Sequence, residues 1–286
     1  MKLGLALSGG GVRGMAHIGA LRALVESGIR IDALAGTSAG ALVGGLFAAG
    51  YIPDELEEIA LSIDQSLVPY SVLSIVSDVV YAGLSRKKRL EGLISNKKLY
   101  KLLHKHLGDL RIGQVSIPLA VPTVDIQSGQ TVIFVSEQKN LRDSATIVCE
   151  TDCFLAQAVL ASAAIPAVFP PVIIDGRKLV DGGVSDNIPV AVLQAMEMDV
   201  VVAVDLGGAA MEPQKVDSIF EIAWRAQEIQ GCTLGDTQRA LADVLIQPDV
   251  SGVKLFDFFQ TQALIQQGYE ATMGKIKLLK SMQGVR

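Results

Sequence analysis

Gly36-Thr37-Ser38-Ala39-Gly40 is the stretch around which this chain is organised. It follows a short apolar run, 31–35, which only Asp32 interrupts, and it precedes the apolar segment 41–49. That order predicts a strand, a sharp turn and a buried helix. A serine at such a strained corner projects its hydroxyl into a cleft, while the flanking glycines leave room for neighbouring backbone. The helix that begins there also directs its positive end at the serine oxygen.

A second glycine-rich turn lies upstream. Residues 2–8 predict a short buried strand, Gly9-Gly10-Gly11-Val12-Arg13-Gly14 follows, and the apolar pattern of 15–27 predicts a helix that Gly28 ends. Strand, helix and strand of this length form a βαβ unit with parallel strands. Both glycine turns should therefore lie at the carboxyl edge of one sheet, where open α/β sheets place their ligands.

The first turn also matches G-x-G-x-x-G, so a dinucleotide site is the obvious rival interpretation. Such a site needs an acidic residue at the end of the second strand to hold the ribose. Here that strand ends in 36–38, and Asp32 lies at its beginning. We favour a run of backbone N–H groups that cradles an anion, which becomes an oxyanion hole beside a nucleophilic serine.

Composition sets the class of protein. Of 286 residues, 50% are hydrophobic and 19% charged, which favours a parallel sheet covered on both faces. A net charge of −5 argues against nucleic acid as the main partner. The odd cysteine count predicts free thiols in a reducing, cytoplasmic setting with no metal set: Cys149, Cys153 and Cys232. We expect no signal peptide, because the N-terminal apolar run 3–7 is too short and lacks a cleavage site. We also expect no spanning helix, since prolines interrupt the low-charge runs 66–85 and 156–174.

A basic segment follows the first of those low-charge runs, in which Asp78 is the single charge. One interpretation is a solvated helix face. The other is an apolar lid beside a basic patch that meets anionic lipid at a membrane surface. The basic residues are Arg86, Lys87, Lys88, Arg89, Lys97, Lys98, Lys101 and Lys105.

The rest of the chain continues the α/β pattern. Gly207-Gly208 is a weak boundary candidate and divides the chain into a main domain, 1–206, and a C-terminal helical extension packed on it, 207–286. The further predicted elements are strands at 117–125, 131–135, 172–174, 178–180, 200–204 and 244–246, and helices at 153–164, 217–240 and 258–282.

An activated serine needs a proton acceptor. The histidines are His17, His104 and His106, and none follows in the order Ser, Asp, His that an α/β-hydrolase triad requires. We interpret His17 as structural and the other two as surface residues.

A carboxylate then acts directly on the serine. Asp181 is the favoured carboxylate, because it follows a hydrophobic strand and precedes Gly182 and Gly183, which permit close backbone approach. Asp205, at a strand end, and Asp186, near a helix start, are rivals, as is Asp125.

These three motifs, in this order, resemble the patatin-like phospholipase family, and most closely its small bacterial members and the catalytic domain of neuropathy target esterase. The similarity runs from about residue 2 to 206 and includes 162–166 and Pro170-Pro171. It implies a three-layer α/β/α fold with a mainly parallel central sheet, Ser38 as nucleophile and Asp181 as base. It also implies an oxyanion hole built from the first glycine turn: Gly9, Gly10, Gly11, Arg13 and Gly14.

The expected function is a serine esterase or lipid acyl hydrolase of the phospholipase A or lysophospholipase type, with no metal and no cofactor. Its expected partners are phospholipid, lysophospholipid or another acyl ester, with peripheral contact to a membrane and none to nucleic acid. Two alternatives stay open: a transacylase, and a non-catalytic lipid-binding regulatory module. The presence of Ser38, Asp181 and the glycine turn speaks against the second alternative. The oligomeric state is open.

Overall fold

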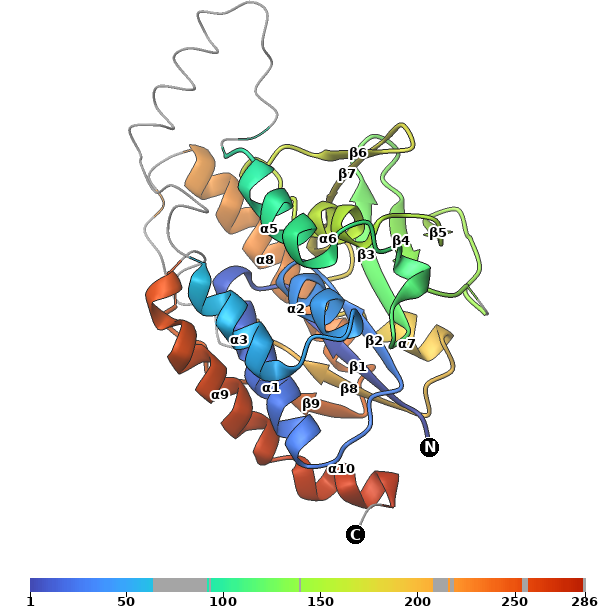
Figure 1. The fold of residues 1–286 in the computed structure, drawn as a ribbon. Coiled ribbons are helices and arrows are strands. Elements are labelled where there is room, and N and C mark those ends of the chain that lie inside the picture. Colours follow the sequence, from blue (N-terminus) through green and yellow to red (C-terminus); the bar gives the residue numbers. More distant parts are fainter. Residues whose placement is uncertain are drawn as a thin grey trace, which may run out of the picture.

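The computed structural model describes residues 1–63, 92, 94–138, 140–207, 216, 219–253 and 257–284 (Figure 1). The hypothesis of an apolar lid at 66–85, and its first four basic residues, lie outside this part of the chain.

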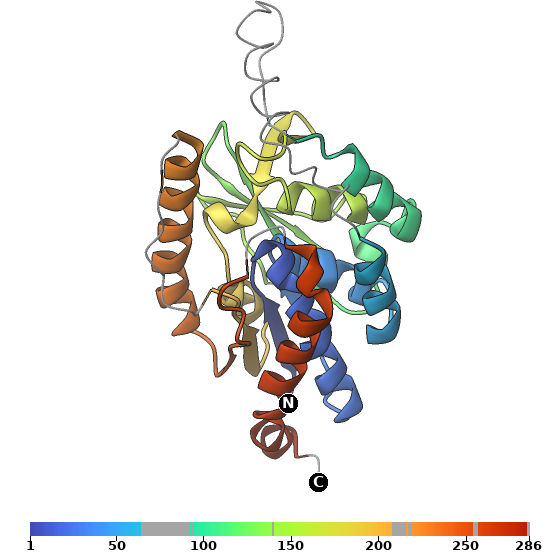
Figure 2. The same cartoon turned by 90° about the vertical axis from the view of Figure 1, so that its left-hand side faces the viewer.

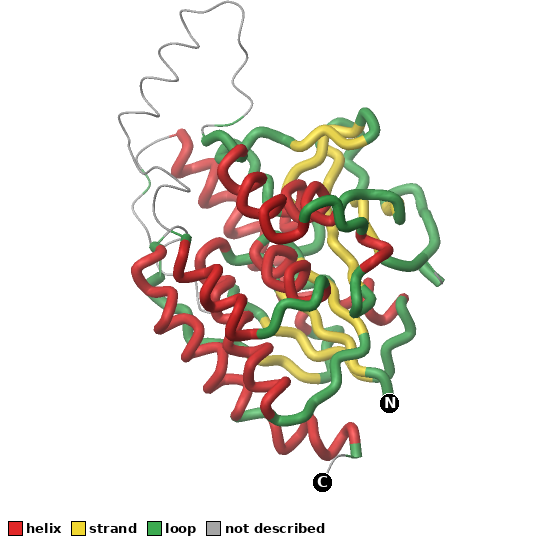
Figure 3. Tube along the Cα trace, viewed as in Figure 1, coloured by secondary structure: helices red, strands yellow, loops and turns green. Residues whose placement is uncertain are grey.

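Nine described strands form one sheet (Figure 3). Seven of them lie in the order β5-β4-β3-β2-β1-β8-β9, and β7 pairs with β3 and with β6. The strands are β1 (Leu3–Leu7), β2 (Ala33–Gly36), β3 (Leu119–Asp125), β4 (Thr131–Val135), β5 (Ile147–Glu150), β6 (Val172–Ile174), β7 (Arg177–Asp181), β8 (Val200–Val204) and β9 (Val244–Ile246).

The pairing is mainly parallel. β1 runs parallel to β2 and β8, β2 to β3, β8 to β9 and β4 to β5, whereas β3 pairs antiparallel with β4 and β7. The predicted βαβ unit and the hairpin at 117–135 are thereby confirmed.

Helices cover both faces of the sheet, so the predicted three-layer α/β/α fold is confirmed (Figure 2). α7 and α8 lie on one face, and the other helices gather on the opposite face. The helices are α1 (Met15–Glu26), α2 (Ala39–Ala48), α3 (Pro53–Ser62), α5 (Lys97–Leu107), α6 (Leu155–Ser162), α7 (Val190–Ala195), α8 (Ile219–Arg239), α9 (Thr261–Met273) and α10 (Ile276–Gln283).

Strand alternation divides the core between the two faces. Leu5 and Leu7 of β1 pack with the helices around α1 and α2, whereas Ala6 points to the side of α7. Small alanines recur on that second face, at Ala33 and Ala35 of β2. The central strands are therefore buried on both sides, as their near-continuous apolar sequence predicts.

Residues after 206 join the same core. β9 extends the sheet beside β8, and α9 lies against α1. The α1–α9 approach is very close, because a Cβ on Gly19 would lie 1.8 Å from the carbonyl oxygen of Ile265, and one on Gly268 would lie 1.8 Å from that of Ala16.

Three local features can be compared with the sequence predictions. The strand β5 was not predicted. The helical pattern at 258–282 separates into a 3-10 turn, α9 and α10, with the break at Gly274. The three cysteines are free, as predicted; Cys149 and Cys153 are buried and Cys232 is partly exposed.

Candidate active site

Ser38 occupies the turn between β2 and α2. Its backbone has φ 54° and ψ −115°, a conformation that residues other than glycine rarely adopt. The neighbouring glycines are required by space, since a Cβ on Gly36 would lie 2.4 Å from the Gly40 carbonyl oxygen, and one on Gly40 would lie 2.1 Å from that of Leu7. The backbone on both sides of the strained serine is thus packed too closely for a side chain at position 36 or 40.

Further hydrogen bonds fix this turn. The Ser38 N–H donates to Ser162 Oγ at 3.0 Å, and that hydroxyl donates to the Pro122 carbonyl at 2.7 Å. Thr37 N–H donates to Leu7 O at 3.1 Å. In the sequence, Ser162 was identified only as part of the stretch 162–166 that resembles the family. Nothing in the sequence indicated that its hydroxyl accepts from the Ser38 N–H.

Asp181 reaches Ser38 through the register of β3. β2 pairs with β3 up to Ala35 opposite Ala120, and β7 runs antiparallel along the next part of β3, with Asp181 opposite Thr123. The ends of β2 and β7 therefore face each other. The Ser38 hydroxyl is thereby close enough to the Asp181 carboxylate to lower its pKa as a hydrogen-bond donor.

Both side chains are shielded from solvent. Ser38 is 6% exposed and Asp181 is 4% exposed. Burial raises the pKa of Asp181 to about 6, although hydrogen bonds from Ser38 and from the Gly183 N–H, at 2.7 Å, act in the opposite direction. Gly182 is pressed against Pro122, whose carbonyl oxygen would lie 2.3 Å from a Cβ at this position.

The glycine turn lies beside Ser38. A Cβ on Gly9 would lie 3.4 Å from Ser38 Cβ, and one on Gly14 would lie 2.4 Å from Ala39 Cβ. The Gly9 N–H donates to Asn187 O at 3.1 Å, and the Arg13 N–H donates to Gly10 O at 3.2 Å.

Those two amides are thus used within the protein. In the described part of the chain no group accepts from the N–H of Gly10 or Gly11. Gly11 begins the 3-10 turn Gly11–Gly14 with φ 58°, and the Arg13 side chain fastens the turn to Val253 O at 2.9 Å. Gly10 and Gly11 therefore remain as candidate donors to an oxyanion.

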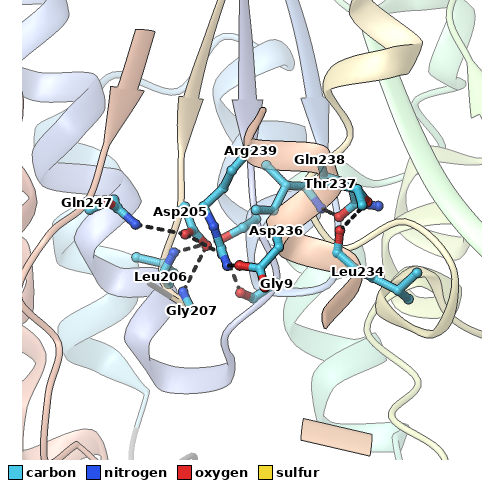
Figure 4. Close-up of polar contacts among 12 residues, drawn as sticks. Gly9, Asp205, Leu206, Gly207, Leu234, Asp236, Thr237, Gln238, Arg239 and Gln247 are labelled. Carbon is cyan, nitrogen blue, oxygen red and sulfur yellow. Dashed lines mark hydrogen bonds and ion pairs between the residues drawn. The ribbon is translucent and has the colours of Figure 1, made fainter. Parts of the chain in front are cut away.

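The rival carboxylates have other partners. Asp125 accepts hydrogen bonds from Ser128 and from the Gln127 and Lys178 N–H groups at its own turn. Asp205 forms a buried ion pair with Arg239 at 2.9 Å (Figure 4).

Asp186, the third rival, accepts from Gln238 Nε2 at 2.9 Å, and burial raises its pKa to about 7. Of the four carboxylates, Asp181 is the one whose pKa the Ser38 hydroxyl lowers.

His17 is buried, as its structural interpretation requires. Its Nε2–H donates to Ser8 O at 2.8 Å, and burial lowers its pKa to about 4, so the ring is neutral. Its Nδ1 has no hydrogen-bond partner within the described residues.

The interpretation of both later histidines as surface residues was wrong for His106. His104 is exposed, but His106 is partly buried, lines a cavity and lies 3.2 Å from the Tyr51 hydroxyl through Nδ1. Its spacing from Leu99 and Leu103 places it on the inward face of α5, a signal that the basic character of this segment obscured.

An apolar cavity opens beside Ser38. It contains about 970 Å³ of space free of atoms, part of it open to solvent, and Ser38 and His106 are the polar side chains among the described residues that line it. The walls come from α1, α2, α3 and α5, with Leu42, Val43 and Leu46 marking successive turns of α2 away from the serine. Such walls suit a hydrocarbon chain.

A strained serine and a buried carboxylate, set at one edge of an α/β/α sheet beside an apolar cavity, define a class of α/β proteins with a serine at a strand-to-helix turn. The chain belongs to the patatin-like phospholipase family, whose model matches residues 5–193.

Similar proteins agree with this membership. The chain is 33% identical to an uncharacterized NTE family protein of Mycobacterium bovis over 214 residues, 75% of this chain and 51% of that protein. It is 32% identical to the lysophospholipase NTE1 of Mycosarcoma maydis over 211 residues, 72% of this chain and 10% of that protein. The chain thus spans about half or less of these relatives' length. The structure of VipD from Legionella pneumophila shares the fold, with a TM-score of 0.50 and 16% identity over 96% of this chain and 66% of VipD.

Neither a metal cluster nor a membrane-spanning helix occurs in the described residues. No cluster of three or more His, Cys, Asp or Glu side chains suited to a metal ion occurs among them. Within the same residues, no helix has the length and apolar character needed to cross a bilayer.

Proposed function

We propose that this protein is a serine esterase that hydrolyses acyl esters of lipids, of the phospholipase A or lysophospholipase type. The observation that carries the proposal is the pairing of the strained Ser38 with the buried carboxyl of Asp181, beside an apolar cavity that Ser38 lines. The relatives named lysophospholipase point to the same class of substrate: phospholipid, lysophospholipid or another acyl ester.

The reaction begins with Asp181 ionised. Asp181 accepts the proton of Ser38 Oγ as that oxygen attacks the ester carbonyl, whose hydrocarbon chain lies in the cavity. Negative charge develops on the carbonyl oxygen, and the N–H groups of Gly10 and Gly11 stabilise it together with the N-terminus of α2. Collapse of this intermediate releases the alcohol, which takes the proton back from Asp181.

Hydrolysis of the acyl-enzyme follows the same path. Asp181 accepts a proton from water, the resulting hydroxide attacks the acyl carbonyl, and Ser38 leaves with the proton from Asp181. Asp181 thus serves as the base in both half-reactions, and His17 has a structural role through its hydrogen bond to Ser8 O.

Replacement of the nucleophile tests this function. Ser38→Ala should abolish hydrolysis of p-nitrophenyl esters and lysophospholipids while circular dichroism and the melting temperature remain those of a folded protein. Turnover by the folded Ser38→Ala protein equal to that of the unmodified one would remove Ser38 from the mechanism. Product analysis with added glycerol or lysolipid separates hydrolysis from acyl transfer.

A further inference from the structure

The last turn of α8 contacts the loop that follows Asp181. This acid loop, residues 182–188, begins with a 3-10 turn at Gly182–Val184 and ends where α7 approaches. Gln238 accepts a hydrogen bond from the Ile188 N–H at 2.9 Å through Oε1, and its Nε2 donates to Asp186 Oδ1 at 2.9 Å. Its side-chain amide thus fastens both ends of a three-residue segment. α8 lies beyond residues 5–193, which the family model matches.

The same three residues hold the other parts of the site. Thr37, next to Ser38, donates through Oγ1 to Asp186 O at 2.8 Å. The Gly9 N–H donates to Asn187 O at 3.1 Å, and the Asn187 side chain lies against Gly9 and Gly183. Segment 186–188 therefore connects the serine turn, the glycine turn and α8: Asp186 bonds to Thr37 and Gln238, Asn187 bonds to Gly9, and Ile188 bonds to Gln238.

We propose that Gln238 is a positioning residue that fixes segment 186–188 and, through it, the distance between the glycine turn, Ser38 and Asp181. The proposal rests on the function above in treating Ser38 and Asp181 as catalytic. The glycine turn, the serine turn and the acid loop are far apart in the sequence, and these hydrogen bonds join them directly beyond the ends of their strands. Displacements of about 1 Å in such a site cost about a hundredfold in rate.

The charge at Asp186 makes the Gln238 amide the appropriate group. Burial opposes ionisation of this carboxyl, and the N–H that Gln238 donates favours the ionised form. The charged side chains on the elements packed against this loop are Asp181 at its start, Asp125 on β3, Asp205 at the end of β8, and Arg225, Glu228, Asp236 and Arg239 on α8. Arg239 is engaged by Asp205 and Asp236 (Figure 4), which leaves Gln238 as the contact of this turn with Asp186.

The first test compares two neighbouring residues of α8. Gln238→Ala should lower kcat for a p-nitrophenyl ester by about ten- to a hundredfold. KM should stay within about twofold, because the cavity lies on the opposite face of the sheet, among α1, α2, α3 and α5. Thr237→Ala is the matched control: Thr237 is exposed and its hydroxyl donates within the helix to Leu234 O, so both constants should be unchanged.

A second variant supplies a signature that loss of structure would not produce. Gln238→Glu keeps the side-chain length and the acceptor for Ile188, but it sets a carboxylate against Asp186. Its kcat relative to the unmodified enzyme should therefore be lowest at high pH. It should recover as the pH falls through about 7, where one of the two carboxyls takes a proton. A pH-independent ratio would overturn the proposal. This variant also decides the matter if Gln238→Ala does not fold.

Hydrogen exchange provides a measurement that does not depend on activity. Gln238→Ala should speed exchange of the amides in 182–188, and Thr237→Ala should not. Unchanged exchange there, together with kcat within twofold, refutes the positioning role. If the unmodified protein hydrolyses no ester, the proposed function fails while exchange still reports on the Gln238 contact, so the two failures are distinguishable.

Discussion

Asp181 must be ionised to accept the Ser38 proton, and its burial opposes ionisation. We therefore expect kcat/KM for a soluble ester to rise with pH through about 6 and to level off above it. Asp181→Asn should lower kcat nearly as far as Ser38→Ala, because the two side chains act as a unit. A pH–rate profile of the unmodified enzyme and one of Asp181→Asn measure both effects. Activity that is flat down to about pH 4.5 would contradict the assignment of the base.

The raised pKa of Asp181 also makes the free energy of unfolding depend on pH. Because the folded pKa of Asp181 lies above its ordinary value of 3.8, its contribution to stability is full below about pH 4 and is lost as the pH rises through about 6. Asp181→Asn should therefore stabilise the protein near pH 8, by at most about 3 kcal/mol, and the gain should vanish near pH 4. Urea unfolding at the two pH values measures it.

Asp125 supplies a control of opposite sign. Burial opposes its ionisation, but hydrogen bonds from Ser128, Gln127 and Lys178 outweigh that effect and lower its pKa. Asp125→Asn should destabilise the protein at pH 8 and lose its effect as the pH falls below about 4. Equal responses of the two variants would show that the shifts do not arise from the local environments described.

At the scale of elements, the packing of α9 on α1 depends on glycine. Gly268→Ala places a methyl group where the Ala16 carbonyl oxygen lies, so the two helices must separate. We expect a loss of about 1–3 kcal/mol in the free energy of unfolding, measured with urea. Gly231→Ala in α8 is the matched control, since no atom lies within 4 Å of its added Cβ. It should stabilise the protein by about 0.5–1 kcal/mol, and a similar gain at Gly268 would disprove the close packing.

Elements with a strong local pattern could be predicted from the sequence. The strand at 33–36, the turn at Ser38 and the apolar helix after it follow from G-x-S-x-G between two hydrophobic runs. β5 could not be found in this way, because Ile147–Glu150 is an edge strand with only Cys149 buried and hence no alternation. Gln238 was also out of reach, since its bond to Ile188 joins residues 50 positions apart and a polar residue on a helix is ordinarily solvated.

At the scale of the whole molecule, we propose that α5 directs the enzyme to lipid surfaces. Leu99, Leu103 and Leu107 of this helix are buried, and Lys97, Lys98, Lys101 and Lys105 are exposed on its other side. α5 also forms a wall of the cavity, so a lipid phosphate bound there would lie near the route of an acyl chain. Each lysine near an anionic surface contributes about 1 kcal/mol.

Vesicle co-sedimentation tests this proposal. Binding should increase with the fraction of anionic lipid, decrease with salt and weaken when Lys97, Lys101 and Lys105 are replaced by glutamine. Replacement of Lys277 and Lys280 on α10, and of Lys275 just before it, changes the net charge equally at the end of the molecule away from α5 (Figure 1), and it should leave binding unchanged. Equal losses in both triple variants, or equal binding to neutral and anionic vesicles, would exclude α5 as the contact.

The extent of the domain is a question at the same scale. We propose that 207–286 forms one unit with 1–206, although the family model ends at residue 193. β9 belongs to the central sheet, and Val250, Val253 and Leu264 pack around Val12 of the glycine turn. The tail therefore packs directly against the glycine turn.

The place of β1 in the sheet has a consequence for biosynthesis. Leu3 of β1 is paired with Val200 of β8, so the central strand of the sheet leaves the ribosome nearly two hundred residues before one of its two neighbours. At about 5–20 residues per second, the nascent chain waits about 10–40 s for that partner. During this interval the turn after β1 lacks the backbone contacts that Asn187 and Val253 later provide. We therefore expect the glycine turn, and with it the proposed esterase site, to be complete only after translation has passed Val253.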